Sequence, residues 1–181
     1  MEYRIYHTIK EIVKHAEDTY GSCDAVRYKT GKDTIEAKTY RQIGKDSRHF
    51  SDAIEKLGQQ GAHIALIGVT SYPWLVSYFG IVNGGSVAVP LDVALPAEEL
   101  CELIDRADVT ILILDEIRKD VIEAAKEKCP KLKYILSMQK EANEGNILSL
   151  TKSMMEQTID EDTGVEKTEI TPDQLCTIMF T

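Results

Sequence analysis

The glycine-rich stretch Gly80–Gly85 is the first candidate for chemistry in this sequence, because clustered glycines let backbone amides approach a phosphate. A phosphate-binding loop leaves a strand and enters a helix, so that backbone N–H groups and the helix dipole face the anion. Here the order is reversed, since the glycines follow a helical apolar pattern and precede the apolar run Val87–Val89. The sequence therefore favours a helix C-cap and a tight turn over a phosphate site.

Histidines and cysteines are the side chains that most often bind metals or act as nucleophiles. The four histidines are scattered and include no i, i+4 pair, so we expect no metal centre. They are His7, His15, His49 and His63. The four cysteines form no CxxC pair, which predicts neither a zinc knuckle nor a disulfide framework and favours a reducing cytoplasm. They are Cys23, Cys101, Cys129 and Cys176.

Two further groups of side chains have a structural and a functional interpretation. Asp115 and Glu116 follow an apolar strand, where α/β proteins bind ligands, but helix capping is the favoured role. Trp74, Tyr78 and Phe79 lie within two turns of one helical pattern, and we expect core packing rather than a stacking platform. Since no serine nucleophile elbow is present, the residues of this chain do not by themselves predict an active site.

The elements that position these residues alternate along the chain. Apolar runs predict strands at 63–69, 87–89, 109–114 and 134–136, and intervening helical patterns follow Pro73 and Pro96 and cover 117–128. Before them, an amphipathic helix with Ile5, Ile9, Ile12, Val13 and Ala16 on one face precedes a hairpin of 25–28 and 34–37. Thr39 and Gln42 then form a capping box for another helix. Strands buried on both faces and joined by helices predict an α/β fold: three layers, a mainly parallel sheet with helices on both faces, and a small N-terminal hairpin.

Composition limits the class of protein. The chain has 181 residues, 43% of them hydrophobic, which is enough for one domain with a sizeable core. Its formal charge of −9 argues against a nucleic-acid or anionic-membrane surface. Between Leu57 and Asp92 no residue is formally charged, but glycines and polar residues interrupt this stretch, so a buried strand–helix–strand unit is favoured over a membrane span.

The last part of the chain changes character. Residues 147–155 have the pattern of a short helix, and 156–173 contain seven acidic residues and one lysine, which is typical of a solvated linker. The apolar run Leu175–Phe180 predicts a strand. We therefore divide the chain into an α/β subdomain (1–155), an acidic linker (156–173) and a strand (174–181).

Four motifs, in order along the chain, resemble those of the AMP-forming adenylating enzymes, the AMP-dependent synthetase/ligase superfamily. Thr39–Ile43 resembles the signature T-Y-x-E-L, with Gln42 where Glu is usual, and Phe79–Asp92 is similar to G-x-L-x-A-G-x-x-x-V-P-L-D/N. Pro96–Leu100 is similar to the x-P-x-E-L helix, and Thr171–Thr181 to the lead-in of the phosphate loop. The helix around Trp74 is most similar to long-chain fatty acyl-CoA synthetases, and luciferase-like and peptide-synthetase relatives stay open.

The resemblance implies a reaction for the whole enzyme. A small-molecule carboxylate would attack the α-phosphate of ATP in the presence of Mg²⁺, and a thiol, coenzyme A or one on a carrier protein, would then displace AMP. It implies that Thr181 is the first residue of the ATP phosphate loop, and that the later motifs lie beyond it. We therefore expect this chain to be the N-terminal subdomain of the adenylating-enzyme fold: an inactive fragment without catalytic or metal-binding residues, whose partner is the remainder of its own chain.

The truncated face, led by Leu175–Phe180, is expected to be apolar and to favour self-association. The rival hypotheses are a free-standing flavodoxin- or Rossmann-like module that binds a nucleotide or a protein, and an interaction domain. The first requires a complete phosphate-binding turn after a strand, and the sequence contains none.

Overall fold

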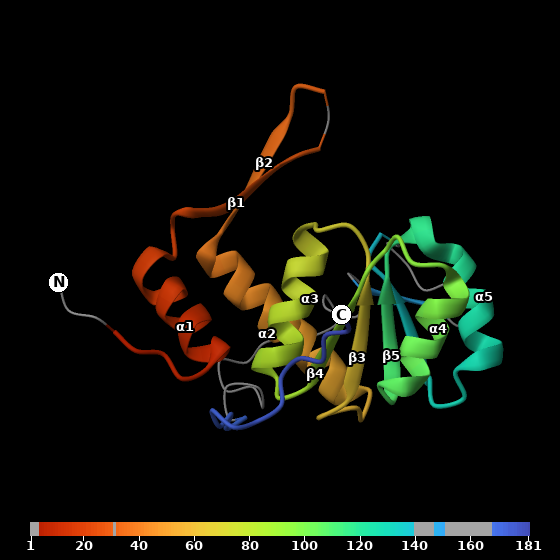
Figure 1. Cartoon of the computed structure of the whole chain (residues 1–181). Helices are drawn as coiled ribbons and strands as arrows, with labels where there is room; N and C mark the ends of the chain where they lie inside the picture. The colour runs from red at the N-terminus through yellow and green to blue at the C-terminus, as the bar shows by residue number, and fades with distance from the viewer. Residues whose placement is uncertain (1–3, 31, 140–146, 151–167) are drawn as a thin grey trace.

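The protein is built around a five-stranded parallel sheet in the order β4-β3-β5-β6-β7 (Figure 1). The computed structural model describes residues 4–30, 32–139, 147–150 and 168–181. The strands of this sheet are β3 (His63–Ile67), β4 (Val87–Leu91), β5 (Val109–Leu114), β6 (Tyr134–Ser137) and β7 (Ile147–Ser149). The helices are α1 (Ile9–Tyr20), α2 (Tyr40–Lys56), α3 (Tyr72–Asn83), α4 (Ala97–Arg106), the short 3-10 helix η1 (Glu116–Arg118) and α5 (Lys119–Lys128).

Two apolar clusters, one on each face of the sheet, make the three layers. Along β5, Leu112 and Leu114 belong to the cluster that α4 and α5 cover. Ile111 and Ile113 belong to the cluster that α2 and α3 cover. This alternation is the two-residue period of a strand buried on both faces. The predicted α/β architecture is thus confirmed.

A separate antiparallel hairpin projects from this body beside α2 and α3 (Figure 1). It consists of β1 (Asp24–Lys29) and β2 (Ile35–Thr39). The chain passes from β2 directly into α2, where Thr39 Oγ1 accepts the amide of Gln42 at 3.2 Å and the Gln42 side chain accepts the amide of Thr39 at 2.8 Å. The predicted hairpin and capping box are both present.

The amphipathic stripe predicted on the first helix is covered only in part. α1 forms but begins at Ile9, so Ile5 of the predicted stripe lies before the helix. The helix has no buried residue, and Ile5 and Ile12 are 76% and 50% exposed. The reason is that α1 contacts the body on one side only, where α2 and α3 lie. Ile9, on that side, packs against the α2/α3 cluster.

The region after β6 differs from the sequence expectation. Residues 147–149 are not helical: they form β7, which pairs in parallel with β6. Three residues contain too little periodicity to distinguish strand from helix, and the open edge of β6 decides the outcome. The rest of the helix predicted over 147–155, and the acidic linker up to residue 167, lie outside the described residues.

The uncharged stretch before Asp92 forms β3, α3 and β4, as predicted. Among the described residues, no helix is long and apolar enough to cross a membrane.

Candidate functional site

The C-terminal segment, residues 174–181, extends the parallel sheet beyond its β4 edge. The amide of Ala88 donates to the carbonyl of Cys176, and the amide of Ile178 donates to the carbonyl of Ala88, both at 2.9 Å. These bonds make a single parallel bridge between Ala88 and Thr177 in place of the predicted longer strand. Because the segment runs parallel to β4, it leads Thr181 toward the carboxyl ends of the strands, where ligands bind in open α/β sheets.

Both layers of helices hold this segment. The hydroxyls of Thr177 and Tyr78 lie 3.2 Å apart, which joins the segment to α3. Cys176 packs against the α2/α3 cluster, while Ile178 and Phe180 pack against the α4/α5 cluster. Thr181 itself is exposed. These contacts hold the residues before Thr181 in place, while Thr181 itself stays exposed to solvent.

At the same edge of the sheet, Asp115 forms hydrogen bonds to backbone groups. It follows β5, is 8% exposed, and its Oδ1 accepts the amide of Ile117 at 3.2 Å at the start of η1. Its amide donates to the carbonyl of Ile67 at 2.9 Å, which ties β5 to the end of β3. The capping role predicted for Asp115 is confirmed, and the amide of its neighbour Glu116 donates to Oε1 of Gln139 at 2.8 Å.

Arg118 is a structural residue at this edge that the sequence analysis missed. Its guanidinium donates to the carbonyls of Val93 and Leu95 at 2.5 and 2.9 Å, and to the carboxylate of Asp120 at 2.8 Å. The pKa of Asp120 falls below its usual value because of this hydrogen bond. Arg118 therefore holds the loop after β4 against the start of α5. No local sequence signal marks it, since its two carbonyl partners lie 25 and 23 residues away.

The glycine-rich stretch lies at the opposite, amino-terminal edge of the sheet, between α3 and β4. Gly84 is the C-cap residue of α3, and Gly85 has a φ of 78°, which favours glycine. The amides of this turn bond to carbonyls of α3, from Gly84 to Gly80 at 3.0 Å and from Ser86 to Ile81 at 3.0 Å. The predicted C-cap and tight turn are confirmed.

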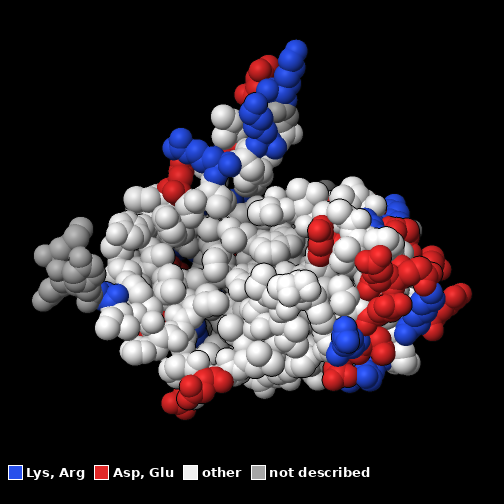
Figure 2. Space-filling model, viewed as in Figure 1, with Lys and Arg blue, Asp and Glu red and all other residues white. Residues whose placement is uncertain are grey.

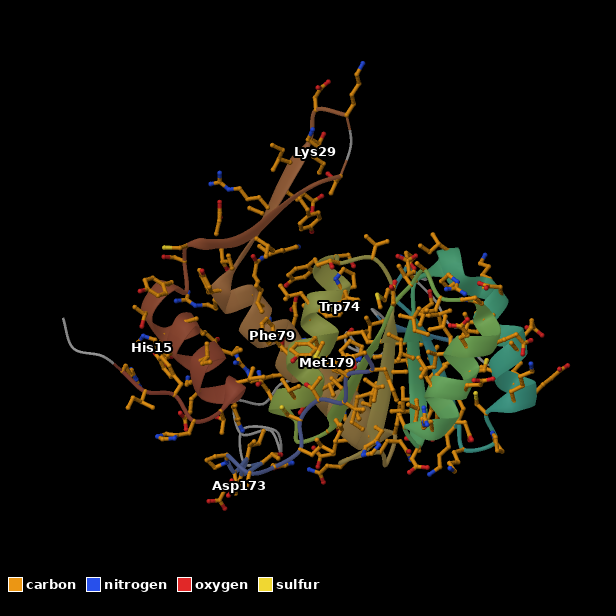
Figure 3. The ribbon with its side chains drawn as sticks, in the orientation of Figure 1. His15, Lys29, Trp74, Phe79, Asp173 and Met179 are labelled. Atoms are coloured by element: carbon orange, nitrogen blue, oxygen red, sulfur yellow. The ribbon has the colours of Figure 1, made fainter. Side chains whose placement is uncertain are left out.

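The predicted aromatic core residues are only partly buried. The rings of Trp74 and Tyr78 stack with centroids 5.6 Å apart, and the rings of Tyr78 and Phe79 meet edge to face at 5.9 Å. Trp74 and Tyr78 pack against the α2/α3 cluster from its margin. Figure 3 shows Trp74 and Phe79 on α3 and Met179 on the C-terminal segment. The bond between Tyr78 and Thr177 joins these two elements.

The candidate metal ligands remain apart in the described part of the chain. There, no three or more His, Cys, Asp or Glu side chains gather closely enough to hold a metal ion. His63 Nδ1 lies 2.6 Å from the carbonyl of Ala107, and His15 lies near Thr19 and Arg4. The described residues therefore do not fit a Mg²⁺ ion on their own. The cysteines are all unpaired, and burial raises the pKa of Cys129 to about 12.

Comparisons with known proteins agree with this geometry. A family model described as AMP-binding enzyme matches residues 14–181. A long-chain-fatty-acid–CoA ligase (ACSBG2) of Xenopus laevis is 22% identical over 184 residues, which cover 96% of this chain and 24% of the relative. The chain thus spans about a quarter of that relative's length.

Solved structures show the same fold. A long-chain-fatty-acid–CoA ligase (FadD1) of Archaeoglobus fulgidus superposes with a TM-score of 0.81 at 16% identity, over 100% of this chain and 35% of its own. The anthranilate CoA ligase AuaEII, solved with anthranoyl-AMP, superposes with a TM-score of 0.77 at 20% identity, over 98% of this chain and 32% of its own.

Proposed function

The chain belongs to the family of AMP-binding enzymes, and from that membership we propose that it is the N-terminal part of an ATP-dependent, AMP-forming acyl-CoA ligase. In the first half-reaction, a carboxylate oxygen attacks the α-phosphorus of ATP, giving acyl-AMP and pyrophosphate. In the second, the thiol of coenzyme A attacks the acyl carbon, and AMP leaves. The observation that carries this proposal is the family match, which spans residues 14–181.

Thr181 is the residue of this chain that the proposal places at the nucleotide. Its support is the parallel path of the C-terminal segment along β4, toward the sheet edge where α/β proteins bind ligands. The hydroxyl would donate one hydrogen bond to a β- or γ-phosphate oxygen. Mg²⁺ would neutralise charge on the same phosphates when ATP is bound.

Thr181 alone cannot bind ATP tightly. One hydrogen bond to a charged group contributes roughly 1.5–3 kcal/mol, whereas micromolar binding requires about 8 kcal/mol. We therefore propose that the 181-residue chain is folded but inactive by itself. Activity would require the rest of the ligase, which is its principal partner in this proposal.

For the substrate we propose a fatty carboxylate, with coenzyme A as the thiol. The support is that the curated relatives from Xenopus laevis, Mus musculus and Thermus thermophilus all have the name long-chain-fatty-acid–CoA ligase.

For the location we propose the cytoplasm, and the unpaired cysteines support it.

The test is pyrophosphate release by the polypeptide that the whole gene encodes, with ATP, Mg²⁺, coenzyme A and either palmitate or anthranilate. We expect release that depends on palmitate, weaker release with anthranilate, and none from the 181-residue chain. Release that depends on no carboxylate would overturn the ligase proposal. A preference for anthranilate would overturn the substrate class, and activity of the 181-residue chain would overturn its proposed inactivity.

In the same polypeptide, Thr181→Ala should raise the Kd for ATP about tenfold to a hundredfold, which is the loss of one charge-assisted hydrogen bond. Thr181→Ser retains the hydroxyl and serves as the matched control. Equal ATP affinity of the native, Ala and Ser proteins would remove Thr181 from the nucleotide site.

A further inference from the structure

A cavity of about 670 Å³ lies between the hairpin and the start of α3, away from the C-terminal segment. The residues that matter for its chemistry are Tyr28, Lys29, Lys38, His49, Tyr72 and Val76. They come from both strands of the hairpin, from α2 and from α3.

Part of the lining of the cavity is apolar and aromatic. The rings of Tyr28 and Tyr72 stack with centroids 6.2 Å apart and planes 15° apart. Behind them, Val76 and Leu150 are 1% and 2% exposed. These side chains offer van der Waals contact to an apolar group, as the walls of small-molecule sites usually do.

Two lysines also line the cavity, one of them over the ring of Tyr72. Lys38 Nζ lies 5.3 Å from the centre of the Tyr72 ring, and Lys29 lines the cavity from the neighbouring strand. Neither ammonium forms an ion pair with a carboxylate anywhere in the described ranges. Figure 2 shows Lys and Arg side chains, with some Asp and Glu among them, along the projecting hairpin, and Figure 3 shows Lys29 on it. Two lysines without an ion pair are notable in a chain whose net charge is −9.

The lysines of the lining outnumber its one acidic residue by two to one. That residue is Asp46, and its Oδ2 already accepts the hydroxyl of Tyr72 at 2.7 Å. His49 Nε2 is buried and has no hydrogen-bond partner in the described structure. Thr70 and Ser71 line the cavity at the N-terminus of α3, where the helix dipole favours negative charge.

We propose that this cavity binds a small amphipathic anion, a carboxylate or phosphate head with a short apolar tail, as a monomer from solution. Lys29 and Lys38 would hold the head, while Tyr28, Tyr72 and Val76 contact the tail. This site does not depend on the proposed ligase activity, because it uses no residue of the C-terminal segment and needs no ATP.

The test uses Trp74, the one tryptophan of the chain, which follows Pro73 at the wall of the cavity. Its fluorescence is titrated with octanoate, octyl phosphate, acetate and the neutral octyl glucoside, all below their micelle concentrations. We expect saturable binding of octanoate or octyl phosphate, and at least tenfold weaker binding of acetate and octyl glucoside. Equal binding of octyl glucoside, or no saturable binding of either octanoate or octyl phosphate, would overturn the proposal.

Variants locate the binding. Lys38→Gln should raise the Kd for octanoate at least fivefold, whereas Lys32→Gln, in the same hairpin but outside the cavity, should leave it unchanged. Tyr72→Phe retains the ring but frees the Asp46 carboxylate, so it should also weaken binding. Circular dichroism confirms that each variant is folded. Unchanged affinity in both Lys38→Gln and Tyr72→Phe would exclude this cavity as the site.

Discussion

Several of the buried polar residues of this protein lie on α2 rather than at the candidate nucleotide site. Asp52 is one of them: its side chain is 7% exposed, and Oδ2 has no hydrogen-bond partner in the described structure. Burial, and secondarily the charge of Glu55, raises the pKa of Asp52 above its ordinary value. An ionised carboxylate here opposes folding at neutral pH.

We expect Asp52→Asn to increase the free energy of unfolding at pH 7 by on the order of 1 kcal/mol, because it removes a buried charge. Since the folded protein holds this proton more tightly than the unfolded chain, the native carboxylate lowers stability as the pH rises above about 4, its unfolded pKa. The gain from Asp52→Asn should therefore shrink on acidification toward that pH.

Urea denaturation of both proteins at several pH values measures this difference. A stability gain that is the same at all pH values would assign the effect to packing rather than to the charge. A loss at pH 7 would show that the carboxylate has a stabilising partner.

At the scale of elements, α2 and α3 lie in close contact and together cover one face of the sheet. The C-terminal segment packs against the same layer through Cys176. A Cβ atom at Gly80 would lie 2.5 Å from the Phe50 ring and 2.7 Å from the carbonyl of Ser47. At Gly44, also in α2, a Cβ would instead meet the carboxylate end of the Glu17 side chain. The glycine of α3 therefore sets the distance between the two helices.

Gly80→Ala should lower the free energy of unfolding by about 1–3 kcal/mol, because the backbone of α2 must move to admit the methyl group. Gly44→Ala is the matched control: the end of the Glu17 side chain can shift, at some cost to its ion pair with Arg48, and alanine has the higher helix propensity. Its free energy of unfolding should therefore fall by less than that of Gly80→Ala. Thermal and urea denaturation compare the three proteins. Equal effects of both substitutions would contradict this account of the α2–α3 contact.

Short sequence motifs were enough to predict the ends of helices that are fixed by residues close by in the chain. The capping box at Thr39, the position of Pro73 in the first turn of α3 and the C-cap at Gly84 are all determined within a few residues. Two features required distant partners and were not predictable in this way. β7 exists because β6 offers an edge, and the C-terminal segment pairs with β4 through only one bridge.

At the scale of the whole molecule, the face that holds α3 and the C-terminal segment has few charged side chains (Figure 2). On the C-terminal segment Leu175 and Met179 are 54% and 73% exposed. Because the segment pairs with β4 through a single bridge at Ala88, it leaves other backbone groups of this sheet edge open to a further strand. Exposed apolar side chains beside an open edge favour association.

We expect the 181-residue chain to self-associate through this face as its concentration rises. Sedimentation velocity over a wide concentration range should show a dimer or larger species. The double substitution Leu175→Lys and Met179→Lys should shift the equilibrium to monomer, while Ile35→Lys, an exposed apolar position on the hairpin, should not. A native protein that stays monomeric at every concentration would contradict the expectation.

The proposed ligase reaction transfers a carboxylate oxygen to the α-phosphate of ATP. The most direct measurement is the fate of ¹⁸O when the polypeptide encoded by the whole gene acts on [¹⁸O]palmitate, ATP, Mg²⁺ and coenzyme A. Attack of the carboxylate on the α-phosphorus, followed by thiol displacement, leaves one labelled oxygen in AMP, so mass spectrometry should find the label in AMP. Label in inorganic phosphate with ADP as the product would contradict the account.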